Sequence, residues 1–177
     1  MKKTVPLSQQ DYELTPDGRF IIKQYNDKRP FSNFLPGIAG LFGTPMWVFY
    51  VNRGQGVASF GTRNKDNAIL EFFPANKAYQ QVTSLGFRTF LKILQRENVV
   101  FYEPFSEAPA HAESSCLRHV GRGNGMPRAL QWMEVSSHEL VIREVNEALG
   151  LEVLVKYFTI PGEPLAVLAR EVSLTNR

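Results

Sequence analysis

The sequence predicts an all-β fold, an antiparallel β-sandwich with at most one or two short helices. Three observations support this prediction. Apolar and polar residues alternate with a period of two in several short segments, which is the pattern of extended strands. Turn signals rich in Gly, Pro or Asn separate these segments at short, regular intervals. The chain also has 13 Phe and 6 Tyr among its 177 residues, a content that suits packed sheets better than a bundle of helices.

The N-terminal part of the chain divides into a polar segment and the first elements of the sandwich. Residues 1–18 are polar and end in a turn, and the sandwich domain is expected to span residues 19–177. Residues 19–25 predict the first strand. Residues 26–44 are rich in Pro and Gly and predict a loop, but their many large apolar side chains indicate that this loop packs against the domain. The side chains expected to pack are Phe31, Phe34, Leu35, Ile38, Leu41 and Phe42.

The middle of the chain predicts a hairpin and a short helix. Residues 46–52 and 57–61 form the strands of the hairpin, and a Gly-containing corner joins them. A further strand is expected at residues 68–73. Residues 74–85 begin with Pro and fit either a short helix or a loop that crosses between sheets.

The second half of the chain continues the pattern after one long interruption. Strands are expected at residues 86–94 and 98–102, and a long irregular loop follows at about 105–128. From residue 140 onward the sequence predicts regular β-hairpins. The final strand, residues 165–175, has no later segment to pair with, and an open sheet edge invites aggregation. We therefore expect the chain to be an excised module of a larger protein.

The composition excludes several classes of protein. The net charge is +3, and basic residues are interleaved with acidic ones, so no nucleic-acid partner is expected. No segment approaches the roughly 18 consecutive apolar residues of a membrane helix, and the N-terminus lacks the apolar core of a signal peptide. The single cysteine, Cys116, excludes an intramolecular disulfide and fits a reducing compartment. A cytoplasmic protein with no membrane partner is therefore expected.

Two motifs in the 105–128 loop suggest ligand chemistry but lack the required spacing. His111, Cys116 and His119 match no closed zinc pattern, and a fourth ligand is not evident. The stretch at 121–125 has Gly at every second position, but no strand that leads into a helix surrounds it, so it does not predict a phosphate-binding loop. No metal and no cofactor are expected.

The catalytic motifs are equally weak. The Ser-Ser-His-Glu stretch at residues 136–139 suggests a nucleophile and a base, but adjacent residues on a strand face opposite ways, so no local triad is expected. Four carboxylates alternate with apolar residues on expected strands, which predicts that they lie on the solvent face of a sheet. These carboxylates are Glu134, Glu144, Glu152 and Glu171. No catalytic residue is assigned.

One group of residues around a hairpin has the chemistry of a sugar site. Sugars bind to aromatic faces that stack on their C–H groups, while planar amide or guanidinium groups reach the hydroxyls. The candidate carbohydrate-binding residues are Trp47, Tyr50, Asn52, Arg53 and Gln55. The alternative interpretation is that Trp47 and Tyr50 belong to the sheet core and that Arg53 is a turn residue.

Two long segments, residues 19–80 and 136–176, resemble the N-terminal region of bacterial cellobiose phosphorylase-like proteins. The resemblance implies an antiparallel β-supersandwich, related in fold to galactose mutarotase and longer than this chain. The motifs that carry it are a Pro-aromatic-x-Asn stretch (Pro30-Phe31-Ser32-Asn33), a Gly-rich segment that runs into an aromatic strand, and the turn Asn52-Arg53.

The resemblance also implies a function. Members of this family cleave β-glucosidic links with phosphate or water, and their general acid lies in a downstream (α/α)₆ barrel. The resemblance therefore assigns no catalytic residue to these 177 residues. The expected role is that of a non-catalytic module of a glycoside phosphorylase or hydrolase. Such a module packs on the catalytic barrel, helps to form a homodimer and contacts a β-glucoside or gluco-oligosaccharide.

Two other functions fit the same sequence. The first is a self-contained lectin-like protein, in which Trp47 and Tyr50 form the stacking platform. The second is a small sugar epimerase of the mutarotase type. Such an enzyme needs a histidine general acid and a carboxylate base in one cleft, and the chain offers only His111, His119 and His138.

Overall fold

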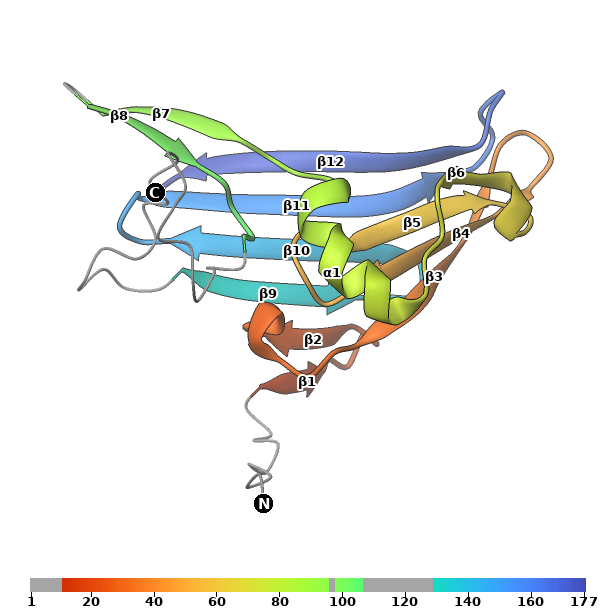
Figure 1. The fold of residues 1–177 in the computed structure, drawn as a ribbon, viewed down its shortest axis with the longest axis horizontal. Coiled ribbons are helices and arrows are strands. Elements are labelled where there is room, and N and C mark those ends of the chain that lie inside the picture. The colour runs from red at the N-terminus through yellow and green to blue at the C-terminus, as the bar shows by residue number, and fades with distance from the viewer. Residues whose placement is uncertain (1–10, 96–97, 107–128) are drawn as a thin grey trace, which may run out of the picture.

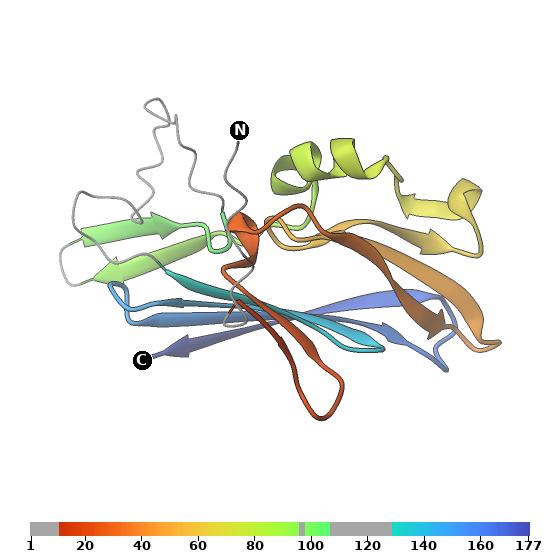
Figure 2. The same cartoon turned by 90° about the horizontal axis from the view of Figure 1, so that it is seen from below.

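Residues 11–95, 98–106 and 129–177 are the part of the chain that the computed structural model describes, and they form an antiparallel β-sandwich (Figure 1). Figure 2 shows its two main sheets as separate layers, with helix α1 (Ala75–Leu85) on the outside of one of them. The predicted all-β class is confirmed. Of the two interpretations of residues 74–85, the helix is correct.

The larger layer is a six-stranded sheet in which every neighbouring pair is antiparallel. Its regular alternation of inward and outward side chains matches the period of two in the sequence. In spatial order its strands are β1 (Tyr12–Leu14), β2 (Phe20–Lys23), β9 (Leu130–Val135), β10 (Glu139–Asn146), β11 (Leu151–Ile160) and β12 (Val167–Asn176).

The smaller layer is a four-stranded sheet, and a separate hairpin adds a two-stranded sheet. Two 3-10 turns, η1 (Tyr25–Asp27) and η2 (Lys65–Asn67), connect strands. The smaller layer contains β3 (Ser32–Ala39), β4 (Thr44–Val51), β5 (Val57–Thr62) and β6 (Ala68–Leu70), and the hairpin contains β7 (Leu91–Gln95) and β8 (Asn98–Tyr102).

The core lies between the two layers, and strand β4 shows how it is built. Met46, Val48 and Tyr50 point toward the six-stranded sheet and belong to the main cluster of buried side chains. Phe49 and Val51 point to the other side and pack with Ala78 and Val82 of α1. From Val48 to Val51 both faces of β4 are therefore covered, which explains the continuous apolar sequence of this part of the strand.

Strand β3 lies inside residues 26–44, where the sequence predicted a loop, so that prediction is wrong for this part. Pro36 and Gly37 produced the loop signal. The structure accommodates them because β3 is at the edge of the four-stranded sheet, where proline is tolerated. Gly37 is also required at this position, since an added β-carbon would lie 2.4 Å from Cγ2 of Thr159 on β11.

The strand also explains which apolar side chains of this segment are buried. Leu35 is buried in the core and Phe31 packs partly against it, as expected. The other four side chains expected to pack are exposed instead, because alternate residues of β3 face outward and the β3–β4 turn projects from the sheet. These exposed side chains are Phe34, Ile38, Leu41 and Phe42.

Two further differences concern the ends of the expected elements. Residues 12–14 were assigned to the polar N-terminal segment but form β1, which pairs with β2. Of the expected 105–128 loop, residues 107–128 lie outside the described residues, and with them His111, Cys116, His119 and the 121–125 stretch.

In the part of the chain that is described, no helix is long and apolar enough to span a membrane.

Candidate functional site

An aromatic cleft lies on the outer face of the four-stranded sheet. Phe34, Trp47, Lys65 and Phe72 line a cavity of about 180 Å³. The Phe34 and Phe72 side chains are 48% and 36% exposed, so their rings are available to a ligand. The Phe34 and Phe72 rings stack with centroids 6.1 Å apart, and the Trp47 ring stands nearly perpendicular to that of Phe72 at 6.0 Å.

Local structure holds the Trp47 indole in a fixed position. Its Nε1–H donates a hydrogen bond of 3.1 Å to the carbonyl oxygen of Asn64. Gly61 lies beneath the ring, and an added β-carbon there would be 2.7 Å from Cζ2 of Trp47. The buried ring of Phe49 supports Phe34 and Phe72 from below, with centroid distances of 4.9 and 5.2 Å. The aromatic cleft is therefore pre-formed.

A polar turn, η2, borders the aromatic cleft. The side chain of Asn64 accepts hydrogen bonds from the backbone N–H of Asp66 and from the amide of Asn67, at 3.1 and 2.8 Å. Lys65 is highly exposed and forms an ion pair with Asp66. Because an exposed ion pair contributes little to stability, the Lys65 ammonium can exchange Asp66 for a ligand hydroxyl at small cost.

Of the five predicted sugar-binding residues, Trp47 is the one that lies in the aromatic cleft. Tyr50 is three residues away on the same strand and faces the opposite side, where it is 1% exposed in the core. Burial raises the pKa of Tyr50 to about 12. The two rings therefore do not share one surface.

Asn52 is fully buried, and its amide joins two segments of backbone. Its Oδ1 accepts a hydrogen bond of 2.7 Å from the backbone N–H of Phe31. Its Nδ2 donates to the carbonyl oxygens of Tyr25 and Arg29, each at 3.0 Å. All of these partners belong to the connection between β2 and β3, so Asn52 anchors that connection to the end of β4.

Arg53 and Gln55 also contact protein groups. The Arg53 guanidinium donates to the carbonyl oxygens of Lys28 and Asn52 at 2.9 and 2.6 Å, and it lies over the Tyr79 ring. The buried Gln55 side chain donates to Oγ1 of Thr89 at 3.1 Å. The structure therefore does not place these polar side chains beside Trp47.

Sequence reasoning missed three members of the aromatic cleft, namely Phe34, Lys65 and Phe72. Phe34 was not recognised as a cleft residue because residues 26–44 were interpreted as a loop, and a loop does not assign side chains to the faces of a sheet. A period of two through Phe34, Leu35 and Pro36 would have placed Phe34 opposite the buried Leu35. Lys65 comes from a turn, and its proximity to the rings could not be inferred from sequence.

One carboxylate contradicts the sequence analysis. Glu144 was expected on the solvent face, yet it is 2% exposed and points to the inner side of β10. Its carboxylate accepts hydrogen bonds from the Tyr102 hydroxyl, the backbone N–H of Phe105 and the Gln131 amide, the last two at 2.7 and 2.6 Å. Burial raises the pKa of Glu144, although these hydrogen bonds act in the opposite direction.

The Glu144 network joins the β7–β8 hairpin to the six-stranded sheet. Asn26 extends it by donating to the Gln131 side chain at 2.9 Å and to the Phe105 carbonyl at 3.2 Å. Phe105 has a positive φ of 61°, a conformation that costs energy for a bulky residue. Because every oxygen of the carboxylate is used and the group is closed to solvent, the network serves the fold rather than chemistry.

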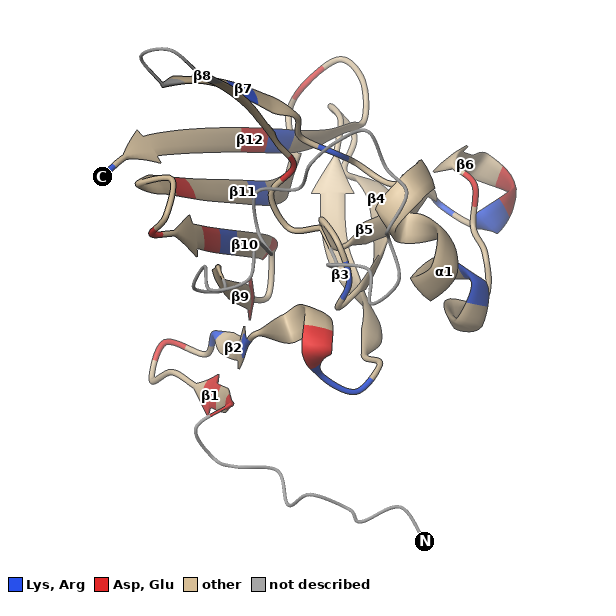
Figure 3. Cartoon of the chain, turned by 60° about the vertical axis from the view of Figure 1, so that its left-hand side comes forward, with Lys and Arg blue, Asp and Glu red and all other residues tan. Residues whose placement is uncertain are grey.

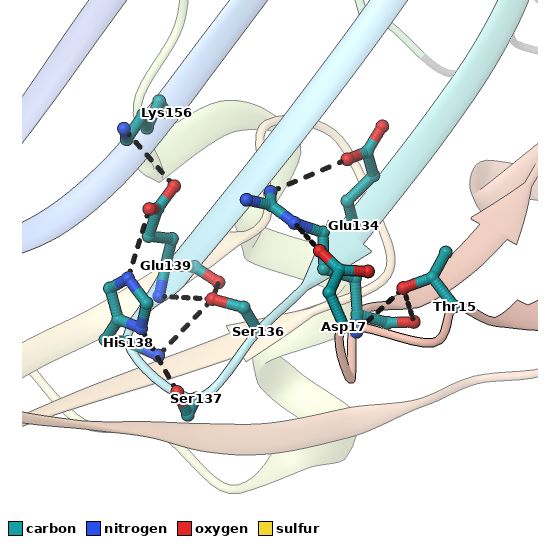
Figure 4. A network of polar contacts seen from close by, with 9 residues as sticks. Thr15, Asp17, Glu134, Ser136, Ser137, His138, Glu139 and Lys156 are labelled. Atoms are coloured by element: carbon teal, nitrogen blue, oxygen red, sulfur yellow. Dashed lines mark hydrogen bonds and ion pairs between the residues drawn. The ribbon is translucent and has the colours of Figure 1, made fainter.

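The Ser-Ser-His-Glu stretch is arranged differently from the expectation. Ser137 and His138 lie in the turn between β9 and β10, not on a strand, so their side chains are free to meet (Figure 4). Ser137 Oγ is 3.1 Å from Nδ1 of His138, and Nε2 of His138 is 3.1 Å from the Glu139 carboxylate. The premise that Ser137 and His138 lie on a strand is therefore wrong.

The contacts from Ser137 through His138 to the Glu139 carboxylate lack the surroundings of a catalytic site. The His138 side chain is 72% exposed, and Lys156 competes for the Glu139 carboxylate at 3.3 Å. A catalytic triad needs a protected imidazole and oriented donors for the developing oxyanion. Ser136 instead uses its hydroxyl to accept the Glu139 backbone N–H at 3.0 Å. The arrangement is that of a hydrogen-bonded turn.

Charge and metal-binding groups add no further site. Strands β10, β11 and β12 each carry both basic and acidic residues (Figure 3), as the interleaved sequence indicated. Within the described ranges, no group of three or more His, Cys, Asp or Glu side chains is placed to hold a metal ion. The aromatic cleft thus stands as the best candidate.

Comparison with known proteins adds no identification. The chain matches no protein-family model, and no curated protein is significantly similar to it.

Proposed function

We propose that this chain is a non-catalytic β-sandwich module of a cytoplasmic carbohydrate-active enzyme, a glycoside phosphorylase or hydrolase that acts on β-glucosides. The module contributes a sugar contact at the aromatic cleft. The observation that supports this contact is the set of pre-positioned rings of Phe34, Trp47 and Phe72, of which Phe34 and Phe72 are exposed and Trp47 is half-buried. Their apolar faces can stack on sugar C–H groups, and the Lys65 ammonium can donate to a hydroxyl.

The size of the aromatic cleft limits what it can hold. Its volume of about 180 Å³ is below the roughly 300–1,000 Å³ of typical small-molecule pockets. A single sugar ring is therefore the expected occupant, with the rest of an oligosaccharide extending along the surface. Such a contact gives weak binding on its own. The overall affinity rises when a catalytic domain binds the other end of the same oligosaccharide.

Tryptophan fluorescence tests the sugar contact directly. The chain has two tryptophans, so Trp132→Phe leaves Trp47 as the single reporter. Titration of this variant with cellobiose and longer β-gluco-oligosaccharides is expected to give a saturable change in emission. Adding Phe34→Ala should weaken the apparent affinity by about two- to tenfold, because aromatic contacts contribute about 0.5–1.5 kcal/mol.

Phe42→Ala is the matched control. Phe42 is 95% exposed and does not line the aromatic cleft, so its removal deletes an aromatic ring without changing the proposed contact. An unchanged sugar response in Phe34→Ala, or no response to any β-glucan oligomer, would overturn the sugar contact.

The packing role in this proposal involves a second copy of the chain. The β7–β8 hairpin and the residue before it carry apolar side chains that are more than half exposed, and patches of this kind often mark interfaces. Sedimentation velocity over a range of concentrations would detect a homodimer, and Phe101→Glu should shift it toward monomer. These side chains are Phe90, Leu94, Val99 and Phe101.

The lectin-like alternative uses the same aromatic cleft without a catalytic partner. The two proposals differ in the size of the native polypeptide. An antibody raised against this chain should detect a much larger band in a native extract if the chain is an enzyme module, and a band of about its own mass of 20.1 kDa if it is a lectin.

A further inference from the structure

Arg170 lies on the inner face of the six-stranded sheet, at the contact between the two layers. It is directly opposite Tyr157 in the register of β11 and β12. Its Nη2 donates to Oε1 of Gln55 and to Oγ1 of Thr89, each at 2.5 Å. Its guanidinium carbon lies 5.8 Å from the centre of the Phe87 ring. The side chain therefore contacts the β4–β5 turn and the segment that follows α1.

All of these partners are neutral, which sets Arg170 apart from other arginines of the chain. Arg19, Arg88, Arg143 and Arg177 each form an ion pair with a carboxylate. Among the described residues, no carboxylate lies within ion-pair distance of Arg170. A positive charge that is only partly exposed is costly when no anion accompanies it.

Two hydrogen-bond donors beside this charge also lack partners. Nε of Arg170 and the hydroxyl of Tyr157 are both buried, and neither has an acceptor within hydrogen-bond distance. Tyr157 is fully buried, and burial raises its pKa to about 12, so the hydroxyl keeps its proton and remains a donor. The neighbouring Arg170 acts in the opposite direction, first as a hydrogen-bond donor to the phenol oxygen and then through its charge. Two unpartnered donors and an uncompensated positive charge converge on one place, and a negatively charged acceptor would satisfy all three.

We propose that Arg170 and Tyr157 form a binding site for a small oxyanion of the phosphate or carboxylate type. The planar guanidinium presents several N–H donors in a fixed geometry that matches such a group. Arg170 is partly exposed, so an anion can approach from solvent. The site lies on the inner side of the four-stranded sheet, whereas the aromatic cleft lies on its outer side, and the two sites are therefore independent.

Thermal unfolding at constant ionic strength tests the site. Sodium phosphate and sodium acetate are titrated in separate series, with sodium chloride replaced to keep ionic strength fixed. At least one oxyanion is expected to raise the melting temperature along a saturable curve, because a ligand that binds only the folded state stabilises it. The series that responds identifies the preferred anion, and isothermal titration calorimetry then gives its affinity.

Three variants separate this site from general salt effects. Arg170→Gln should remove the saturable rise, whereas Arg143→Gln removes the same charge from β10 of the same sheet and should keep it. Tyr157→Phe keeps the ring and should weaken the apparent affinity by about tenfold. If Arg170→Gln does not fold, Tyr157→Phe alone decides the question. Equal responses in wild type and Tyr157→Phe, or no response to either anion, would overturn the proposal.

Discussion

The backbone of Gly37 on β3 lies against the side chain of Thr159 on β11, at a place where the two sheets meet. A β-carbon added to Gly37 would be 2.4 Å from Cγ2 and 2.7 Å from Oγ1 of Thr159. Close by, Gly40 and Pro161 form an isolated parallel bridge between the same two parts of the chain. Strand β3, which carries Phe34 of the aromatic cleft, can therefore approach β11 this closely only because residue 37 is a glycine.

Gly37→Ala is expected to destabilise the fold by about 1–3 kcal/mol, the usual cost of overpacking a close contact. The measurement is urea unfolding followed by circular dichroism. Thr159→Ala removes the two atoms that clash, so the double variant should recover most of the loss. Additive effects of the two substitutions would show that the contact does not limit the approach of β3 to β11.

Asn52 is expected to stabilise the fold and to take no part in sugar binding. Asn52→Ala removes one hydrogen bond from a backbone N–H and two to backbone carbonyl oxygens, and a loss of about 2–4 kcal/mol is expected from these hydrogen bonds together. Asn33→Ala is the matched control, since Asn33 is exposed and bonds only the adjacent backbone N–H of Phe34. Similar stabilities of the two variants in urea would contradict the anchoring role of Asn52.

Much of the fold could be predicted because local patterns determine it. The period of two in residues 151–158 coincides with β11, and helix α1 begins one residue after Pro74. The burial of Glu144 could not be predicted, because its partners Tyr102 and Gln131 are 42 and 13 residues away in sequence. A period of two assigns residues to faces, but only the tertiary contacts decide which face is covered.

Of the candidate sites, the positions of Trp47 and Tyr50 could be predicted from the strand pattern, whereas the contact between Arg170 and Gln55 could not. Trp47 and Tyr50 are three residues apart on one strand, so the pattern alone implies opposite faces. Their shared chemistry suggested a common site, but strand geometry separates them. Arg170 and Gln55 are 115 residues apart, and no sequence pattern links them. The oxyanion site could therefore be recognised only after the layers were in place.

Glu144 should make the stability of the protein depend on pH in a defined direction. Because burial raises its pKa, the folded protein binds a proton at Glu144 more readily than the unfolded chain does. The resulting stabilisation is complete below the ordinary pKa of 4.5 and is lost as pH rises through the folded-state pKa. Glu144→Gln removes the titration.

The measurement for Glu144 is the free energy of unfolding of wild type minus that of Glu144→Gln, across about pH 4 to 8. This difference should fall as pH rises. A difference that stays constant would mean that the three hydrogen bonds to the carboxylate balance its burial, and one that grows with pH would mean that they outweigh it. Comparing the two proteins at each pH cancels the contributions of other titrating groups.

The contacts among Ser137, His138 and Glu139 are expected to affect neither the free energy of unfolding nor any hydrolytic activity. His138 is mostly exposed, and exposed ion pairs contribute about 0–1 kcal/mol, so His138→Ala should change the free energy of unfolding by less than about 0.5 kcal/mol. Hydrolysis of an activated nitrophenyl ester by wild type should equal that of Ser137→Ala. Activity that disappears in Ser137→Ala, at unchanged stability, would make Ser137 a nucleophile and would replace the non-catalytic role proposed for this module.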